Sequence, residues 1–258
     1  MHGTCANGRK FPPVGPDASL PSGKQEVIPI PTPPPPKRHP YDQWAPDARA
    51  LDLVGDKWTL LIVRDLTGGP RRFVELQRVL PGISTEQLRS RLNRMVADGL
   101  LTRQRYREVP PRVDYELTER ARGLLPVVGA LARWGARWAW GPPRQGERVA
   151  VGAILRAATG LPVPSHLHGA VEVAVNGGDG NGGGGFVATL EADGGTLHYA
   201  EHPADHADAR IRGSQSAWVD AFGPNADRSG LTIEGDRSLA EGLLDALGAT
   251  TGAAAAAA

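Results

Sequence analysis

Residues 82–115, GISTEQLRSRLNRMVADGLLTRQRYREVPPRVDY, decide the fold of this chain. Ser84 can accept a hydrogen bond from a backbone amide of a following helix, and Gln87 can reach back to it, which together make a capping box. Gly99 suits the end of that helix. Between these two points four apolar residues recur at helical spacing and, at about 100° per residue, share one side: Leu88, Leu92, Met95 and Val96.

The remainder of this stretch is polar and basic. After Gly99 an arginine-rich strand is expected, followed by a turn at residues 110–111 and a return to Leu117. One interpretation is a helix in the major groove with an arginine-bearing wing on the phosphate backbone. The other is an ordinary surface helix and hairpin, because charge runs are usually solvated faces.

The order of the elements favours the DNA interpretation. A shorter helix is predicted over residues 73–80, and a turn at 81–82 joins it to the helix at 84–98, so two helices and a wing make a winged helix-turn-helix. The base-reading helix and the arginines expected at phosphates supply the candidate DNA-binding residues: Arg71, Arg72, Ser84, Thr85, Glu86, Gln87, Arg89, Ser90, Asn93, Arg94, Arg103, Arg105, Arg107 and Arg112.

Residues 41–140 as a whole resemble the HxlR family of bacterial regulators. The resemblance implies a winged helix-turn-helix domain and a dimeric, DNA-binding transcription factor. Its matching segments are ARALDLVGDKWTLLIVRDL (48–66), GPRRFVEL (69–76), LPGIST (80–85), LRSRLNRMVADGLLTR (88–103), PPRVDYELTERARGL (110–124) and ALARWG (130–135).

This resemblance has one departure near its start. Many members carry a cysteine immediately before a proline, where some sense electrophiles or oxidants, but here Ala45 precedes Pro46. The only cysteine is Cys5, in the N-terminal tail. Thiol sensing at the family's position is therefore excluded in this chain.

A long helix is predicted over residues 118–140, with Thr118 as its cap and an apolar stripe that includes three tryptophans. Packing on its own domain is one explanation of the stripe. A dimer seam is the other, since a two-fold DNA reader needs a second copy to engage two half-sites. The family resemblance favours the seam.

Length and charge indicate two parts with different roles. The 258 residues are enough for two modest domains, and no run of about 18 apolar residues exists, so no membrane span is expected. Residues 41–140 carry 17 Lys and Arg against 12 Asp and Glu, whereas residues 141–258 carry 7 against 14. The positive charge accompanies the expected DNA reader, and the acidic part repels phosphate.

A linker at 141–148 is predicted to lead into a second domain at 149–248. Helices are expected at 149–158, after Ser214 and after Asp236, with strands at 170–175, 186–190, 196–202, 209–212 and 231–234, so the fold class is α+β. The segments 208–222 and 230–247 resemble the SCP2-like (sterol carrier) domain. That resemblance implies an apolar cavity for a lipid-like ligand.

The walls of such a cavity would come from the apolar residues of these strands and helices. The alternative is that the same residues simply fill an ordinary core. The candidate wall residues are Leu190, Leu197, Ile211, Trp218, Phe222 and Ile233.

Outside the two domains, residues 1–40, with eleven prolines, and the alanine-rich end at 249–258 are predicted to be disordered tails.

No catalytic, cofactor or metal site is predicted. Residues 178–183 match G-x-G-x-x-G, but a strand rather than a helix is expected after them, and Pro203 spoils the helix that would align His202 with His206. The sequence therefore predicts a cytoplasmic bacterial regulator that is not an enzyme. It would bind a pseudo-palindromic operator in double-stranded DNA as a homodimer and respond to a small hydrophobic effector. The alternative is a carrier of hydrophobic ligands whose helical domain serves only dimerisation.

Overall fold

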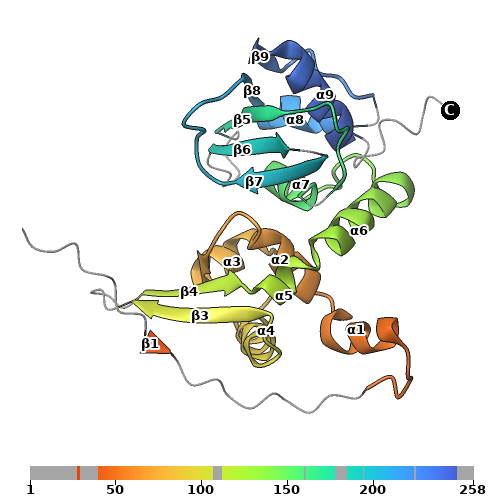
Figure 1. Cartoon of the computed structure of the whole chain (residues 1–258), viewed down its shortest axis with the longest axis vertical. Helices are drawn as coiled ribbons and strands as arrows, with labels where there is room; N and C mark the ends of the chain where they lie inside the picture. Colours follow the sequence, from red (N-terminus) through yellow and green to blue (C-terminus); the bar gives the residue numbers. More distant parts are fainter. Residues whose placement is uncertain are drawn as a thin grey trace, which may run out of the picture.

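The computed structural model describes residues 28–29, 40–106, 112–159, 161–177, 185–193, 195–223 and 225–248. They form two units, each around its own hydrophobic core, and in Figure 1 the C-terminal unit lies above the N-terminal one. The mixed α+β class expected from the sequence is confirmed. Among the described residues, none of the helices combines the length and apolar character needed to cross a bilayer.

The N-terminal unit is a helical cluster with a small sheet at its side. The strands are hydrogen-bonded in the order β1-β3-β4-β2, and β3 pairs antiparallel with β4 to make the wing. Its elements up to the wing are β1 (Ile28–Pro29), α1 (Pro46–Val54), α2 (Thr59–Asp65), β2 (Arg71–Arg72), α3 (Phe73–Val79), α4 (Thr85–Ala97), β3 (Leu101–Tyr106) and β4 (Arg112–Leu117).

Helix α4 begins and ends where the sequence predicts. The Ser84 hydroxyl accepts from the Gln87 amide at 3.1 Å, and the Gln87 side chain accepts from the Ser84 amide at 3.1 Å, which confirms the capping box. Gly99 follows the helix with φ +70°, a conformation that glycine adopts without strain. The side that Leu88, Leu92 and Met95 share is buried in the core of the N-terminal unit.

The predicted N-terminal tail takes part in the sheet at one point. Ile28 pairs with Arg105 and Pro29 with Gln104, so β1 lies along the outer edge of β3. The structure therefore departs from the expectation of a wholly disordered tail at these two residues. The rest of that tail up to residue 39 lies outside the described residues.

The long helix predicted at 118–140 is two helices, α5 (Glu119–Arg122) and α6 (Leu125–Trp138). Thr118 caps the first as expected, accepting from the Ala121 amide at 3.3 Å. The break coincides with Pro126 in the first turn of α6, because proline has no amide hydrogen to donate to the carbonyl four residues earlier and so interrupts a continuous helix.

The C-terminal unit is one five-stranded sheet with helices packed on it. Its strand order is β7-β6-β5-β8-β9, in which β5 and β8 are parallel and the other neighbours antiparallel. Val171, Val173 and Val175 alternate into the core, whereas Glu172 faces Arg210 and Arg212 on the opposite side. The elements are α7 (Val151–Ala157), β5 (Gly169–Asn176), β6 (Phe186–Asp193), β7 (Thr196–Ala200), β8 (Ala209–Ser214), α8 (Gln215–Phe222), β9 (Thr232–Gly235) and α9 (Arg237–Gly248).

Candidate nucleic-acid interface and the contact between the units

The outward side of α4 is polar and open to solvent. In Figure 1, α4 lies at the lower end of the N-terminal unit, on the far side from the C-terminal sheet. Nothing in the described part of the C-terminal unit covers it in this view. Along the helix, Asn93 and Arg94 are half-buried, and the exposed residues are Ser84, Thr85, Glu86, Gln87, Arg89 and Ser90.

Two polar contacts hold α4 in position, and a third lies on its exposed surface. Arg91 pairs with Asp56 at 2.9 Å, which ties the helix to the turn before α2. Gln77 of α3 donates to the Thr85 hydroxyl at 2.8 Å, so the two helices of the helix-turn-helix are joined at the start of α4. Arg89 and Glu86 form an exposed pair at 2.8 Å, a contact that water and phosphate compete with readily.

The described arginines of the wing differ in their exposure and in their partners. Arg103 donates to Asn93 at 3.3 Å and so links the wing to the helix. Arg105 is exposed on β3, and within the described residues no ion pair is recorded for it. Arg112 pairs with the buried carboxylate of Asp114 at 2.7 Å. Arg107 lies outside the described residues.

Arg72 stands at the start of α3 and is half-exposed. Its backbone amide donates to the Glu75 carboxylate at 2.7 Å, and its guanidinium pairs with the same carboxylate at 2.9 Å. Burial acts to raise the pKa of Glu75, but these hydrogen bonds from Arg72 outweigh it and lower that pKa. The carboxylate is therefore held charged and keeps Arg72 close to the helix.

The structure places Arg71 in a different environment from the other candidates. Its side chain is only 13% exposed, pairs with Glu201 of the C-terminal unit and donates to the Asp65 carbonyl at 2.7 Å. The Gly68 backbone lies close to side chains of the C-terminal unit here: a Cβ added at Gly68 would lie 2.8 Å from the Tyr199 ring. Arg71 thus faces the C-terminal unit, and we leave it out of the proposed DNA surface.

A buried ion-pair cluster lies beside Arg71 and joins the two units. The Asp65 side chain, at the end of α2, is 0% exposed and pairs with Arg64 at 2.9 Å and with Arg156 of α7 at 3.1 Å. Arg156 is 6% exposed and also lies 3.6 Å from Glu201. Burial alone would lower the pKa of Arg156, but the charge of Asp65 and its other neighbours outweigh burial and raise it.

Sequence reasoning missed this cluster. The available indication was an aspartate at the end of an otherwise apolar helix, LLIVRDL at residues 60–66, and an arginine within the apolar segment around residue 156. Charged residues are almost never fully buried unless they are paired. That rule predicts a partner for each but not that each is the partner of the other, across 91 positions of sequence.

Five of the six predicted wall residues belong to the hydrophobic core of the C-terminal unit, and Ile233 packs against it. Trp218 and Phe222 pack with ring centroids 5.5 Å apart, and the Trp218 indole donates to the Ala174 carbonyl at 3.2 Å. These two also line a cavity between the units, which the other four do not. The remaining four are Leu190, Leu197 and Ile211, which are buried, and Ile233, which is partly buried.

Metal and dinucleotide sites were not expected, and the described residues contain no group of three or more His, Cys, Asp or Glu side chains placed to hold a metal ion. The glycine-rich stretch is followed by strand β6, as expected, and not by a helix. Residues 178–184 themselves lie outside the described residues.

Comparison with known proteins shows which family the N-terminal unit resembles. The sequence profile of the HxlR-like helix-turn-helix matches residues 53–141. The uncharacterized HTH-type transcriptional regulator sll1512 of Synechocystis sp. is 41% identical over 93 residues, which are 36% of this chain and 69% of that protein. YtcD of Bacillus subtilis, also an HTH-type transcriptional regulator, is 41% identical over 86 residues, 33% of this chain and 68% of that protein. The reduced form of the transcriptional regulator YodB from B. subtilis is 32% identical, covering 38% of this chain and 96% of that one, with a TM-score of 0.34.

Proposed function

This chain belongs to the HxlR-like helix-turn-helix family, whose matched relatives are HTH-type transcriptional regulators, and we propose that it regulates transcription by binding operator DNA as a homodimer. Helix α4 enters the major groove and reads bases, and the wing contacts the phosphate backbone. A two-fold dimer then recognises a pseudo-palindromic site. The single observation that carries the proposal is the outward side of α4 with exposed Arg105 beside it.

The separation of charge supports the same assignment. The exposed helix and wing carry arginines, while the C-terminal unit, with 7 Lys and Arg against 14 Asp and Glu over residues 141–258, lies at the opposite end in Figure 1. Positive charge attracts the phosphate backbone, whereas the acidic unit is repelled by it. DNA is therefore steered to the end of the molecule where α4 lies.

Dimerisation is proposed through α6, whose exposed apolar side has no partner within the described part of one chain. The C-terminal unit is proposed to regulate the DNA reader. A sterol-carrier-like ligand domain stays a prediction for this unit, and the predicted wall residues pack against one another in or against its core. No cavity inside that core is therefore assigned.

The proposal is tested by competition binding. The full chain is titrated against labelled fragments of its own genome, with an excess of random duplex as competitor. A regulator selects particular fragments over random duplex by about 10³-fold or more. Should no genomic fragment bind tighter than random duplex, the regulator proposal fails and a ligand carrier with a dimerising helical domain becomes the better account.

Replacing Arg105 by alanine is expected to weaken binding to every duplex by a similar factor. The reason is that an exposed arginine on the wing neutralises a phosphate and reads no base. The slope of log affinity against log salt should become shallower by about 1. Fluorescence anisotropy at several salt concentrations measures this, with Arg237→Ala, an exposed arginine on α9, as the matched control that leaves the slope unchanged.

Replacing Arg89 by alanine is expected to act differently, because Arg89 is exposed on the side of α4 proposed to face base edges. A bidentate arginine contact to a guanine is worth about 1–3 kcal/mol of discrimination at one position. We measure the affinities of the variant for a selected operator and for its single-base substitutions. The discrimination between bases should shrink at one position and stay unchanged at the others. A uniform loss across all positions would assign Arg89 to the backbone instead.

A further inference from the structure

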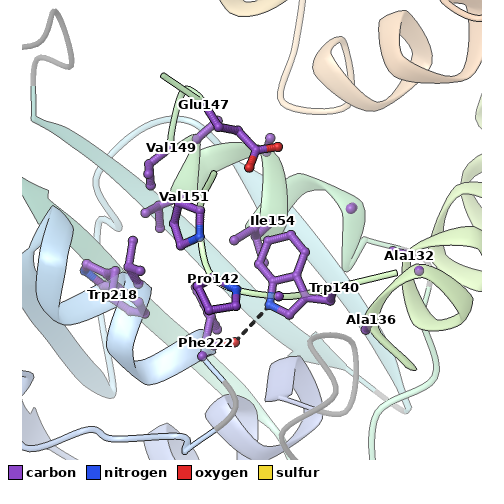
Figure 2. A pocket seen from close by; sticks show the side chains of 18 of the residues that line it. Ala132, Ala136, Trp140, Pro142, Glu147, Val149, Val151, Ile154, Trp218 and Phe222 are labelled. Carbon is purple, nitrogen blue, oxygen red and sulfur yellow. Dashed lines mark hydrogen bonds between the residues drawn. The ribbon is translucent and has the colours of Figure 1, made fainter. Parts of the chain in front are cut away.

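A cavity of about 1000 Å³ lies between the two units, outside the core in which a ligand site was expected. Its walls come from the C-terminal half of α6, the connecting residues 139–144, helix α7 and helix α8. In Figure 2 the indole of Trp140 lies between α6, which carries Ala132 and Ala136, and α8, which carries Trp218 and Phe222. The cavity is at the upper end of the range of about 300–1,000 Å³ typical of small-molecule sites.

The space exists because one wall is built from small side chains, while a tryptophan of the connecting segment is hydrogen-bonded to the opposite wall. Helix α6 contributes Ala132, Gly135 and Ala136 to the cavity, so it cannot fill the gap that its neighbours leave. On the other side the Trp140 indole donates to the Phe222 carbonyl at 3.3 Å, and that hydrogen bond fixes the ring across the connecting segment. A half-exposed tryptophan held in this way is a preformed stacking surface.

The chemistry of the walls selects the class of ligand. Apolar side chains, among them Pro142, Val151 and Ile154, surround the open space in Figure 2. Charges of both signs stand around it and largely offset each other: Arg144 pairs with Glu147 at 3.0 Å, and Arg148 on one side is balanced by Asp220 on the other. A charged ligand would gain little there and would lose its hydration.

We propose that this cavity binds an uncharged, aromatic or polycyclic small molecule that stacks on Trp140. Its regulatory meaning rests on the proposed function. The cavity wall residues of α6 lie on a different side from its exposed apolar stripe, so the same helix contacts the ligand on one side and the second copy on another. Filling the cavity therefore biases the position of α6 and, through the dimer, the spacing of the two α4 helices.

The test uses the full chain and N-phenyl-1-naphthylamine, an uncharged aromatic probe whose fluorescence rises in apolar surroundings. The wild type should bind the probe with a micromolar dissociation constant. Two variants, Ala136→Trp and Ala132→Phe, fill the cavity from α6. Each should weaken probe binding tenfold or more. Arg133→Trp places the same side chain at an exposed position of α6 outside the cavity and should bind the probe like the wild type.

Two results overturn the site: no saturable probe binding by the wild type, or equal binding by both cavity-filling variants while they melt at the wild-type temperature. Probe binding needs no DNA, so it can succeed where the operator experiment fails. Conversely, Ala136→Trp should still select the operator in the absence of the probe. The regulatory step is then read by adding the probe to the operator titration, where the wild-type affinity should change several-fold and that of Ala136→Trp should not.

Discussion

Asp65→Asn is expected to lower the free energy of unfolding by about 3 kcal/mol. The substitution keeps the shape of the side chain but removes the negative charge on which Arg64 and Arg156 converge at 2.9 and 3.1 Å. Breaking a buried ion pair on one side costs about 3–5 kcal/mol, because the other charge is left without compensation. The lower end is expected here since Glu201, 3.6 Å from Arg156, remains.

Urea unfolding followed by circular dichroism measures this loss. The matched control is Glu241→Gln, the same change of carboxylate to amide in the exposed pair with Arg237 at 2.9 Å, which should cost less than about 1 kcal/mol. The double variant Asp65→Asn/Arg156→Met should be more stable than Asp65→Asn alone, because methionine removes the stranded charge. An Asp65→Asn protein as stable as the Glu241→Gln control would show that the cluster is not buried in solution.

The winged helix-turn-helix could be predicted because its evidence is local. The capping box of Ser84 and Gln87, the apolar repeat from Leu88 to Met95 and the stop at Gly99 all lie within 16 consecutive residues. Each of these signals determines a backbone conformation or a buried side through residues close in sequence, without any contribution from distant parts of the chain. The break between α5 and α6 also has a local signal, Pro126, which the predicted continuous helix over 118–140 did not take into account.

The contact between the units could not be predicted in this way. The local sequence around Arg71 predicts a phosphate contact, since this residue follows a turn and precedes a helix. Its partner Glu201 is 130 residues away in sequence, and nothing in either neighbourhood indicates the other. The same holds for Arg156 and Asp65. Pairing across an interface depends on how two folded surfaces meet, and one sequence carries no direct record of that.

The C-terminal unit shows the same limit for cavities. Burial of Leu190, Leu197 and Ile211 follows from strand alternation, and the structure buries all three. Burial alone does not separate a wall from a filled core. The cavity lies instead where Ala132, Gly135 and Ala136 face the other unit, and in sequence such residues indicate only close helix packing. The space becomes visible once the two units are placed together.

The second large effect is expected at α6. Val127, Leu131, Trp134 and Trp138 are among the exposed large apolar residues, and their spacing of 4, 3 and 4 is the a/d repeat of a two-helix seam. Within the described chain this stripe stays open, since Trp134 is 60% exposed. A second copy of α6 is the partner that the proposed two-fold operator complex requires.

Trp134→Glu is therefore expected to convert the dimer to monomers. Burying about 150 Å² of tryptophan at about 25 cal/mol per Å² contributes roughly 4 kcal/mol for each copy, so the loss from one copy alone weakens association about a thousandfold. Light scattering at micromolar concentration measures the state, and the operator affinity should fall toward that of a half-site. Arg133→Glu is the control: it adds more negative charge to the same helix, but at about 100° per residue it lies far around the helix from the stripe. A wild-type chain that is monomeric at this concentration would overturn the proposed dimer. A Trp134→Glu chain that stays dimeric would place the seam elsewhere, because a carboxylate buried on both copies in place of an aromatic residue strongly weakens a seam.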